Sequence, residues 1–286
     1  MIFPAPAMVL SAVVSIQIGA ALASQLFPAL GALGTVAWRV LFAALILLLV
    51  ARPRLRGLAR AELGLLLLFG VVVAAMNAFF YLAIERLPLG VVVTIEFLGP
   101  LGVGALRATR WLERIWVALA LLGVALLAPF SGADLDPVGL VFAVLSGSAW
   151  GSFVLLSTRV GRVFPGSAGI ALGMGIAALL LLPWAVDSAA TLFAGPRLLG
   201  TVLAVALLST AVPFALEFHA LRRLSSTVYG TLISLEPAMA AIAGALILGE
   251  VLGMRALLAI ACVTVAAIGS SLVRAVPAPA APDRPV

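Results

Sequence analysis

The sequence is poor in charge and in the residues that build metal sites. Charged residues make up 10% of its 286 residues, whereas a soluble domain has about 25%. It contains no lysine, a single histidine, His219, and a single cysteine, Cys262. A lone cysteine excludes an internal disulfide and a thiolate cluster, and a lone histidine excludes a metal site with two histidine ligands. We therefore expect no metal and no other cofactor.

Hydrophobic residues are abundant: they make up 64% of the chain, and the mean hydropathy is +1.28. This composition predicts an all-α integral membrane protein. The net charge of +6 comes from arginine, and no soluble domain is left to present it to nucleic acid, so we expect the bilayer as the surroundings. No basic residue precedes the first apolar run, and Gln17 interrupts it, which favours a retained helix over a cleaved signal.

Ten apolar segments are candidates for membrane-spanning helices. Crossing the hydrocarbon core takes about 20 residues, and charged or Pro/Gly-rich stretches divide the chain into segments of about this length. The segments are residues 8–27, 33–51, 63–84, 89–106, 115–129, 138–158, 168–186, 198–218, 227–248 and 256–273. The connections between them are short, so we expect no extramembrane domain.

The placement of arginine tests this count independently. With a cytoplasmic N-terminus, thirteen arginines fall in inside loops or the C-terminus, three fall in outside loops, and Arg39 alone lies within a span. This asymmetry obeys the positive-inside rule and predicts ten spans with both termini in the cytoplasm. Residues 275–286 are rich in proline and alanine and are predicted to be disordered.

A weak internal repeat divides the chain into two halves. Three features of the first half recur 137 residues later: the pattern Ala-x-x-Arg-Leu from residues 83 and 220, the threonines at 94 and 231, and the prolines at 100 and 237. Five spans per half force the halves into opposite orientations. We therefore predict two inverted repeats, at residues 1–130 and 138–274, which is the usual plan of secondary transporters.

Glu236 and Pro237 stand together in the middle of an apolar segment. A carboxylate at this depth costs roughly 2.5–3.5 kcal/mol, so it is usually functional. Pro237 removes an amide donor, and Pro100 does the same four residues after Glu96, so both prolines predict a helix break at a cavity. Both acids are candidates for proton coupling. In the alternative reading, Glu236 is neutral and bonds a carbonyl freed by Pro237.

Other polar residues in the spans are candidates for substrate binding. Arg39, Asn77 and Glu96 lie at a similar level in the outer half, where Arg39 and Glu96 either form a structural ion pair or belong to a site. Arg39 together with Glu96 and Glu236 could bind both ends of a zwitterion. The remaining candidates are Gln17, Trp150 and Glu217, although Gln17 and Asn77 could instead make helix-packing hydrogen bonds.

Several motifs resemble one known family. These segments are Ser15-Ile16-Gln17-x-Gly19-Ala20, Pro88-Leu89-Gly90, Glu96-Phe97-x-Gly99-Pro100-Leu101, Leu208-Ser209-Thr210-Ala211-x-Pro213, Leu216-Glu217, Gly230-Thr231-Leu232-x-Ser234-x-Glu236-Pro237-Ala238 and Leu248-Gly249-Glu250. They resemble the EamA branch of the drug/metabolite transporter superfamily, and within it the bacterial threonine/homoserine exporters. The resemblance implies ten spans in two inverted repeats in the bacterial inner membrane, and export of small amino acids in exchange for protons. It carries site roles to Gln17, Glu96, Glu217, Glu236 and Pro237.

Rival functions remain open at this point. The chain could instead export drugs, nucleosides or other metabolites, since relatives in the superfamily differ in substrate. An intramembrane enzyme is disfavoured because no Asp pair, Ser/His set or histidine metal motif lies at spanning depth. A channel is disfavoured because no span has a long polar stripe. The expected partners are a small solute, protons and the bilayer, with a homodimer left open.

Overall fold

The computed structural model describes residues 4–53, 59–106, 111–126, 135–164, 167–213 and 232–275, together with residues 216, 220 and 229. Within these ranges the regular structure is helical. The elements are α1 (Ala5–Ser24), α2 (Phe27–Ala51), α3 (Arg60–Ile84), α4 (Leu89–Glu96), α5 (Leu98–Leu106), α6 (Trp111–Ala125), α7 (Pro137–Val163), α8 (Ala168–Asp187), α9 (Ala189–Ala194), α10 (Pro196–Ala206), the π-helix η2 (Leu207–Ala211), α13 (Glu236–Ala243), the π-helix η3 (Gly244–Leu248) and α14 (Met254–Ala275).

Five of these helices are long and apolar enough to cross a membrane, namely α1, α2, α3, α7 and α8. Five shorter apolar stretches lie between them, at Leu89–Val103, Arg114–Ala125, Pro196–Thr210, Glu236–Leu248 and Met254–Gly269. Each of the ten overlaps one of the ten segments expected from the sequence. The prediction of an all-α membrane protein is therefore confirmed.

The second helix begins earlier than the sequence indicates. We expected it from residue 33, but α2 starts at Phe27 and contains a kink at Gly31, whose φ is +69°. This left-handed backbone conformation suits glycine, which has no Cβ to clash. The apolar first turn, residues 27–30, is thus a separate piece that joins the helix at an angle.

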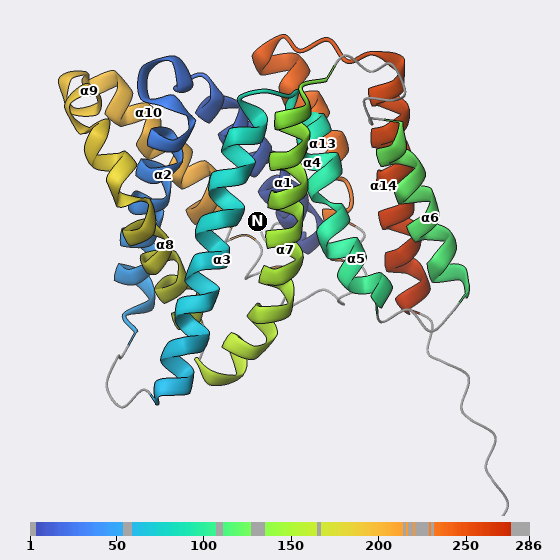
Figure 1. The fold of residues 1–286 in the computed structure, drawn as a ribbon, viewed down its shortest axis with the longest axis horizontal. Helices are drawn as coiled ribbons and strands as arrows, with labels where there is room; N and C mark the ends of the chain where they lie inside the picture. The colour runs from blue at the N-terminus through green and yellow to red at the C-terminus, as the bar shows by residue number, and fades with distance from the viewer. Residues whose placement is uncertain are drawn as a thin grey trace, which may run out of the picture.

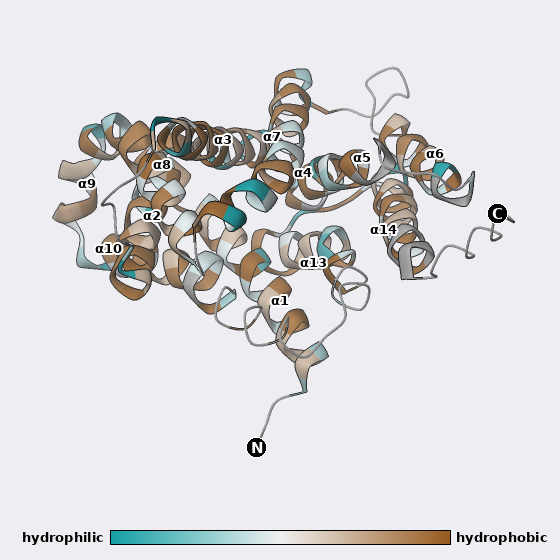
Figure 2. Cartoon of the chain, turned by 90° about the horizontal axis from the view of Figure 1, so that it is seen from below, coloured by the Kyte–Doolittle hydropathy of each residue, from teal (hydrophilic) through white to brown (hydrophobic). Residues whose placement is uncertain are grey.

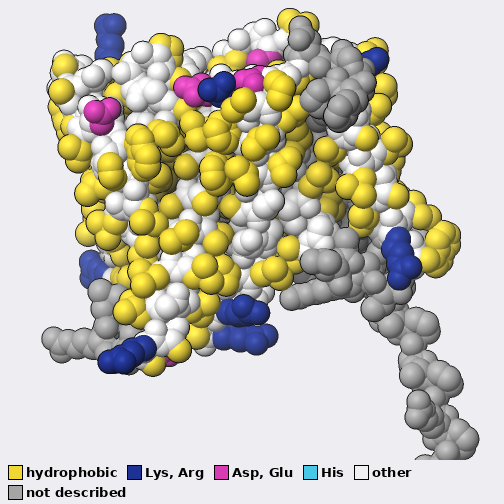
Figure 3. Space-filling view, in the orientation of Figure 1, with side chains coloured by type: hydrophobic (Ala, Val, Ile, Leu, Met, Phe, Trp, Pro, Cys, Tyr) yellow, Lys and Arg dark blue, Asp and Glu magenta, His cyan; other side chains and the backbone are white. Residues whose placement is uncertain are grey.

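The helices stand side by side with their ends at two opposite edges of the molecule (Figure 1). In the same orientation, hydrophobic side chains cover the band between the edges, arginines gather along the lower edge, and acidic side chains gather along the upper edge (Figure 3). Viewed from below, hydrophobic residues dominate the ribbon, and hydrophilic stretches are few (Figure 2). This distribution is that of a protein that faces lipid around its waist.

Helix packing relates the first half of the chain to the second. Helix α2 packs against α8, and α6 packs against α14. Helix α3 packs against α7, while α10 and η2 pack against α1. Helix α5 packs against α7, while α13 packs against α1. Most of the core therefore lies between elements far apart in the sequence.

Regular helix is interrupted at matching places in the two halves. Helix α4 ends at Glu96 and α5 begins at Leu98, with a turn at Phe97 between them. In the second half, the turn at residues 234–235 precedes α13, whose first residue is Glu236. Phe97 and Ser234 are 137 residues apart, which is the offset of the repeat. Each interruption places a glutamate at a helix end.

Glycines let α7 approach the first interruption closely. A Cβ added at Gly147 would lie 2.9 Å from the carbonyl oxygen of Glu96, and one at Gly99 would lie 1.8 Å from the carbonyl oxygen of Gly147. Backbone occupies the space in both cases, so no side chain can swing away. This contact fixes the interruption, and with it Glu96, against α7.

Polar contacts join the halves at the upper edge. The Glu250 carboxylate accepts hydrogen bonds of 3.0 and 3.1 Å from the Leu89 N–H at the start of α4, and burial raises the pKa of Glu250. Arg86 and Asp136 form an exposed ion pair of 3.0 Å, and the hydrogen bond from Arg86 lowers the pKa of Asp136. The first contact joins the segment after η3 to the start of α4, and the second joins the end of α3 to the start of α7.

Replacing Gly99 with alanine should destabilise the protein, because the new methyl group would overlap the Gly147 carbonyl. Such overpacking costs about 1–3 kcal/mol. Gly102→Ala is the matched control in the same helix, since a Cβ there meets nothing within 4 Å. Thermal unfolding of the purified variants in detergent measures the difference. Equal melting temperatures would show that the α5–α7 contact is not tight.

Candidate functional site

A cavity of about 610 Å³ lies where the two halves meet. It receives residues from α1, α2, α3, α4, α7, α8, η2 and α13. Its size is typical of a site for a small ligand. The wall includes Gln17, Arg39, Met76, Asn77, Phe80, Tyr81, Glu96, Trp150, Phe153, Ser157, Ser167, Met174, Ser209, Thr210 and Glu236.

The structure brings six of the seven predicted binding residues to this one cavity: Gln17, Arg39, Asn77, Glu96, Trp150 and Glu236. The seventh, Glu217, lies outside the described residues. The two prolines expected at helix breaks, Pro100 and Pro237, lie three residues after the interruptions rather than in the wall. Pro237 directly follows Glu236, however, and that glutamate does line the wall.

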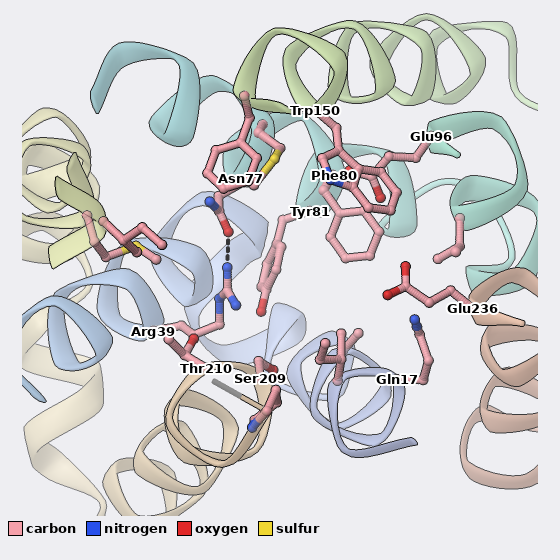
Figure 4. Close-up of a pocket in the computed structure, with 18 of the residues that line it drawn as sticks. Gln17, Arg39, Asn77, Phe80, Tyr81, Glu96, Trp150, Ser209, Thr210 and Glu236 are labelled. Atoms are coloured by element: carbon pink, nitrogen blue, oxygen red, sulfur yellow. Dashed lines mark hydrogen bonds between the residues drawn. The ribbon is translucent and has the colours of Figure 1, made fainter. Parts of the chain in front are cut away.

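Arg39 is held on one side of the cavity by two residues of α3. Its Nη2 donates a hydrogen bond to Asn77 Oδ1. The Asn77 amide in turn donates to the carbonyl of Val73, at 2.8 Å, which fixes its orientation. The guanidinium carbon lies 5.3 Å from the centre of the Tyr81 ring, within the range of a cation–π interaction. Figure 4 shows these three side chains grouped together.

Glu96 occupies a different part of the wall, at the C-terminal end of α4. Its Oε1 accepts a 2.6 Å hydrogen bond from the hydroxyl of Ser146 on α7. Trp150 lies one turn further along α7, and its ring meets that of Phe97 edge-on, with centroids 5.4 Å apart. Arg39 and Glu96 are not in direct ionic contact, because the ion pair found among the described residues is Arg86–Asp136, but the charge of Arg39 still acts on Glu96 from a greater distance. Each residue has a neutral partner from the helix that packs beside it.

Glu236 enters the cavity from the first turn of α13. It is buried, with 8% of its surface exposed, and the N-terminal end of a helix favours a negative charge. Gln17 comes from α1, and its side chain and that of Glu236 point toward each other (Figure 4). Arg39 and Glu236 lie on opposite sides of the view. The cavity thus has a cationic side and an anionic side.

Sequence reasoning missed Tyr81 and Ser146, the residues that contact Arg39 and Glu96. Tyr81 lies four residues after Asn77, so helical spacing places both on one face of α3. Ser146 lies four residues before Trp150 on α7 for the same reason. That spacing was the available signal, but serine and tyrosine are common in apolar helices. Ser209 and Thr210, which belong to one of the motifs shared with the family, also line the cavity from η2.

The arrangement can bind a small polar solute and can hold protons. Carboxyl groups take up and release protons, and a guanidinium holds an anion without losing its own charge. Among the described residues there is no group of three histidine, cysteine, aspartate or glutamate side chains that could hold a metal ion.

Comparisons with known proteins agree with this description. A sequence model of the EamA-like transporter family matches residues 137–272. The threonine/homoserine exporter RhtA of Escherichia coli K12 is 40% identical over 266 residues, which cover 92% of this chain and 90% of that protein. The uncharacterized transporter YwfM of Bacillus subtilis 168 is 29% identical over 208 residues, 69% of each chain. One solved crystal structure shares the fold, with a TM-score of 0.57, 16% identity, and coverage of 94% of this chain and 97% of that one. The chain therefore belongs to the EamA-like transporter family and is a multi-pass membrane transporter, not an enzyme.

Proposed function

We propose that the protein exports small amino acids similar to threonine and homoserine in exchange for protons. The observation that carries this proposal is the cavity between the halves, which combines two buried carboxyl groups with one arginine. A zwitterion needs partners of both signs, and a proton-coupled carrier needs an acid that changes its charge. The similarity to RhtA supports the same solute class.

The proposed architecture is ten spans in two inverted repeats, at residues 1–130 and 138–274. The packing of the helices supports this architecture. At an offset of 137 residues, α3 corresponds to α10 and η2, and α7 corresponds to α1. The contact between α3 and α7 thus has an equivalent in the contact of α10 and η2 with α1. The same correspondence relates α5–α7 to α13–α1, and it leaves α2–α8 and α6–α14 as pairs of counterparts. The family match to residues 137–272 coincides with the second repeat.

The proposed location is the bacterial cytoplasmic membrane, with both termini in the cytoplasm. Helices α2 and α7 end, and α3 and α8 begin, at the arginine-rich lower edge (Figures 1 and 3). The positive-inside rule assigns that edge to the cytoplasm. The predicted tail, residues 275–286, begins at the last residue of α14 and otherwise lies outside the described residues.

The cavity is proposed to open toward the cytoplasm. Its lining extends along α7 to Ser157 and reaches Ser167, the residue before α8, at the arginine-rich edge. At the opposite edge, Glu250 and Leu89 join the halves. This arrangement fits a carrier that is ready to accept a solute from inside the cell.

Proton coupling is assigned to Glu236, with Glu96 as the second acid. Glu236 lies beside the interruption before α13, so a change in its charge acts where the backbone is least regular. Glu96 lies at the equivalent interruption in the first half. Protons would then be taken up at the same cavity that binds the solute.

Glu236→Gln should abolish proton-driven transport while leaving exchange intact, because the amide cannot change its charge. In proteoliposomes with an acidic interior, we expect the wild type to accumulate labelled homoserine about tenfold faster than without a gradient. The variant should show counterflow but no stimulation by the gradient. Glu85→Gln, at an exposed turn, is the control. Full stimulation of the Glu236 variant would assign that residue a structural role. A panel of drugs and nucleosides separates the rival solute classes.

A cysteine at position 157 should react with a charged maleimide only from the arginine-rich side. The background is Cys262→Ser, which removes the single native cysteine. Ser157→Cys lies in the cavity, whereas the control Ser148→Cys lies exposed on the same helix, outside the cavity lining, where lipid keeps the reagent out. Labelling in right-side-out and inside-out vesicles reads the side of access. Reaction from the outside alone would reverse the proposed access.

A further inference from the structure

Arg39 is a buried cation that is in direct contact with no acidic side chain among the described residues. It lies in α2 with 8% of its surface exposed, and it lines the cavity. Within the described residues, the only ion pair joins Arg86 and Asp136 at the upper edge. The Nε of Arg39 is buried and makes no hydrogen bond. An intramembrane arginine in this state is an unusual feature that requires an explanation.

The two residues that hold Arg39 do not neutralise it. Asn77 offers one carbonyl oxygen, and its amide nitrogen is already used on the carbonyl of Val73. Tyr81 offers the face of its ring. Both position the guanidinium, but neither carries a negative charge. A buried charge that is positioned but left unpaired is costly, so a purely structural role is disfavoured.

The described acids of the cavity do not touch the guanidinium, although the charge of Arg39 acts on Glu96 from a greater distance. Glu96 directs its Oε1 to Ser146 on another helix. Glu236 lies across the cavity from Arg39 (Figure 4). Arginine cannot release its proton in proteins, so its charge persists in every step of a transport cycle. A negative charge in direct contact with the guanidinium is therefore left for a molecule that the cavity binds.

We propose that Arg39 binds the carboxylate of the transported solute, and that Asn77 and Tyr81 are positioning residues for it. A guanidinium has five N–H donors and matches a carboxylate in geometry. Asn77 takes one of these donors, and the unpartnered Nε shows that others remain available. The assignment rests on the proposed function for the identity of the solute. It leaves Glu96 and Glu236 for the ammonium group and for protons.

The test compares threonine with threoninamide, which keeps the amine and the hydroxyl but lacks the carboxylate. Competition against labelled homoserine in counterflow gives the apparent affinity of each. We expect threoninamide to bind the wild type about 30-fold more weakly or worse. Arg39→Gln should lower the apparent affinity for threonine by a similar factor and leave the affinity for threoninamide nearly unchanged. Arg86→Gln, which removes the exposed arginine, is the matched control and should keep the wild-type preference.

A stability measurement separates this role from a structural one. Arg39→Met removes an unpaired buried charge, so without solute it should melt at the same temperature as the wild type or higher. Threonine should raise the melting temperature of the wild type and not that of the variant. Asn77→Ala should lower the preference for threonine over threoninamide, which a general packing defect would not do.

The proposal is overturned if Arg39→Gln lowers the apparent affinities for threonine and threoninamide equally, or if it changes neither affinity. It is also overturned if Arg39→Met melts at a lower temperature and still binds threonine. Failure of the wild type to exchange threonine or homoserine contradicts amino-acid export instead. In that case, melting temperatures against a panel of carboxylates and their amides decide the role of Arg39. The proposal is supported if a carboxylate raises the melting temperature of the wild type but not that of Arg39→Gln. It is contradicted if no compound of the panel raises the melting temperature of the wild type.

Discussion

The membrane interior offers charged groups neither water nor counter-ions, and the rest of the structure follows from this constraint. A chain with 10% charged residues can keep most of its charges at the two edges, as the arginines of the lower edge illustrate. Among the described residues, three buried charged side chains depart from that rule: Arg39, Glu96 and Glu236. All three line one cavity between the halves. The free-energy cost of burying charged side chains therefore falls mainly at the cavity, where a bound solute can offset it.

The interrupted helices are the device that puts acids at this place. In a continuous helix, all backbone groups are hydrogen-bonded within the helix, and a glutamate can only project from one side of it. Breaking the helix at Phe97 and at residues 234–235 places Glu96 at one helix end and Glu236 at another. Close packing of Gly147 against the Glu96 backbone then keeps the first break in position without a side chain between the helices.

Most of the candidate site could be predicted from the sequence, because a charge within an apolar run is conspicuous. Arg39, Glu96 and Glu236 were predicted on that ground, and the prolines indicated where the helices break. Tyr81 and Ser146 could not be predicted as members of the site, because hydroxyl groups are tolerated throughout membrane helices. Their importance comes from what they touch, Arg39 and Glu96, and neither contact is local in the sequence.

The sequence by itself determined the number of apolar segments, the distribution of arginine between the two edges and the offset between the halves. These properties depend on hydropathy, length and charge along the chain, which need no knowledge of neighbours. Tertiary structure alone decided the partners within the cavity. Arg39 bonds Asn77 and Glu96 bonds Ser146, although two opposite charges at a similar depth invite pairing. The physical reason is that partner choice depends on how each helix is rotated and tilted against the next. A rotation of one residue, about 100°, changes which side chains meet.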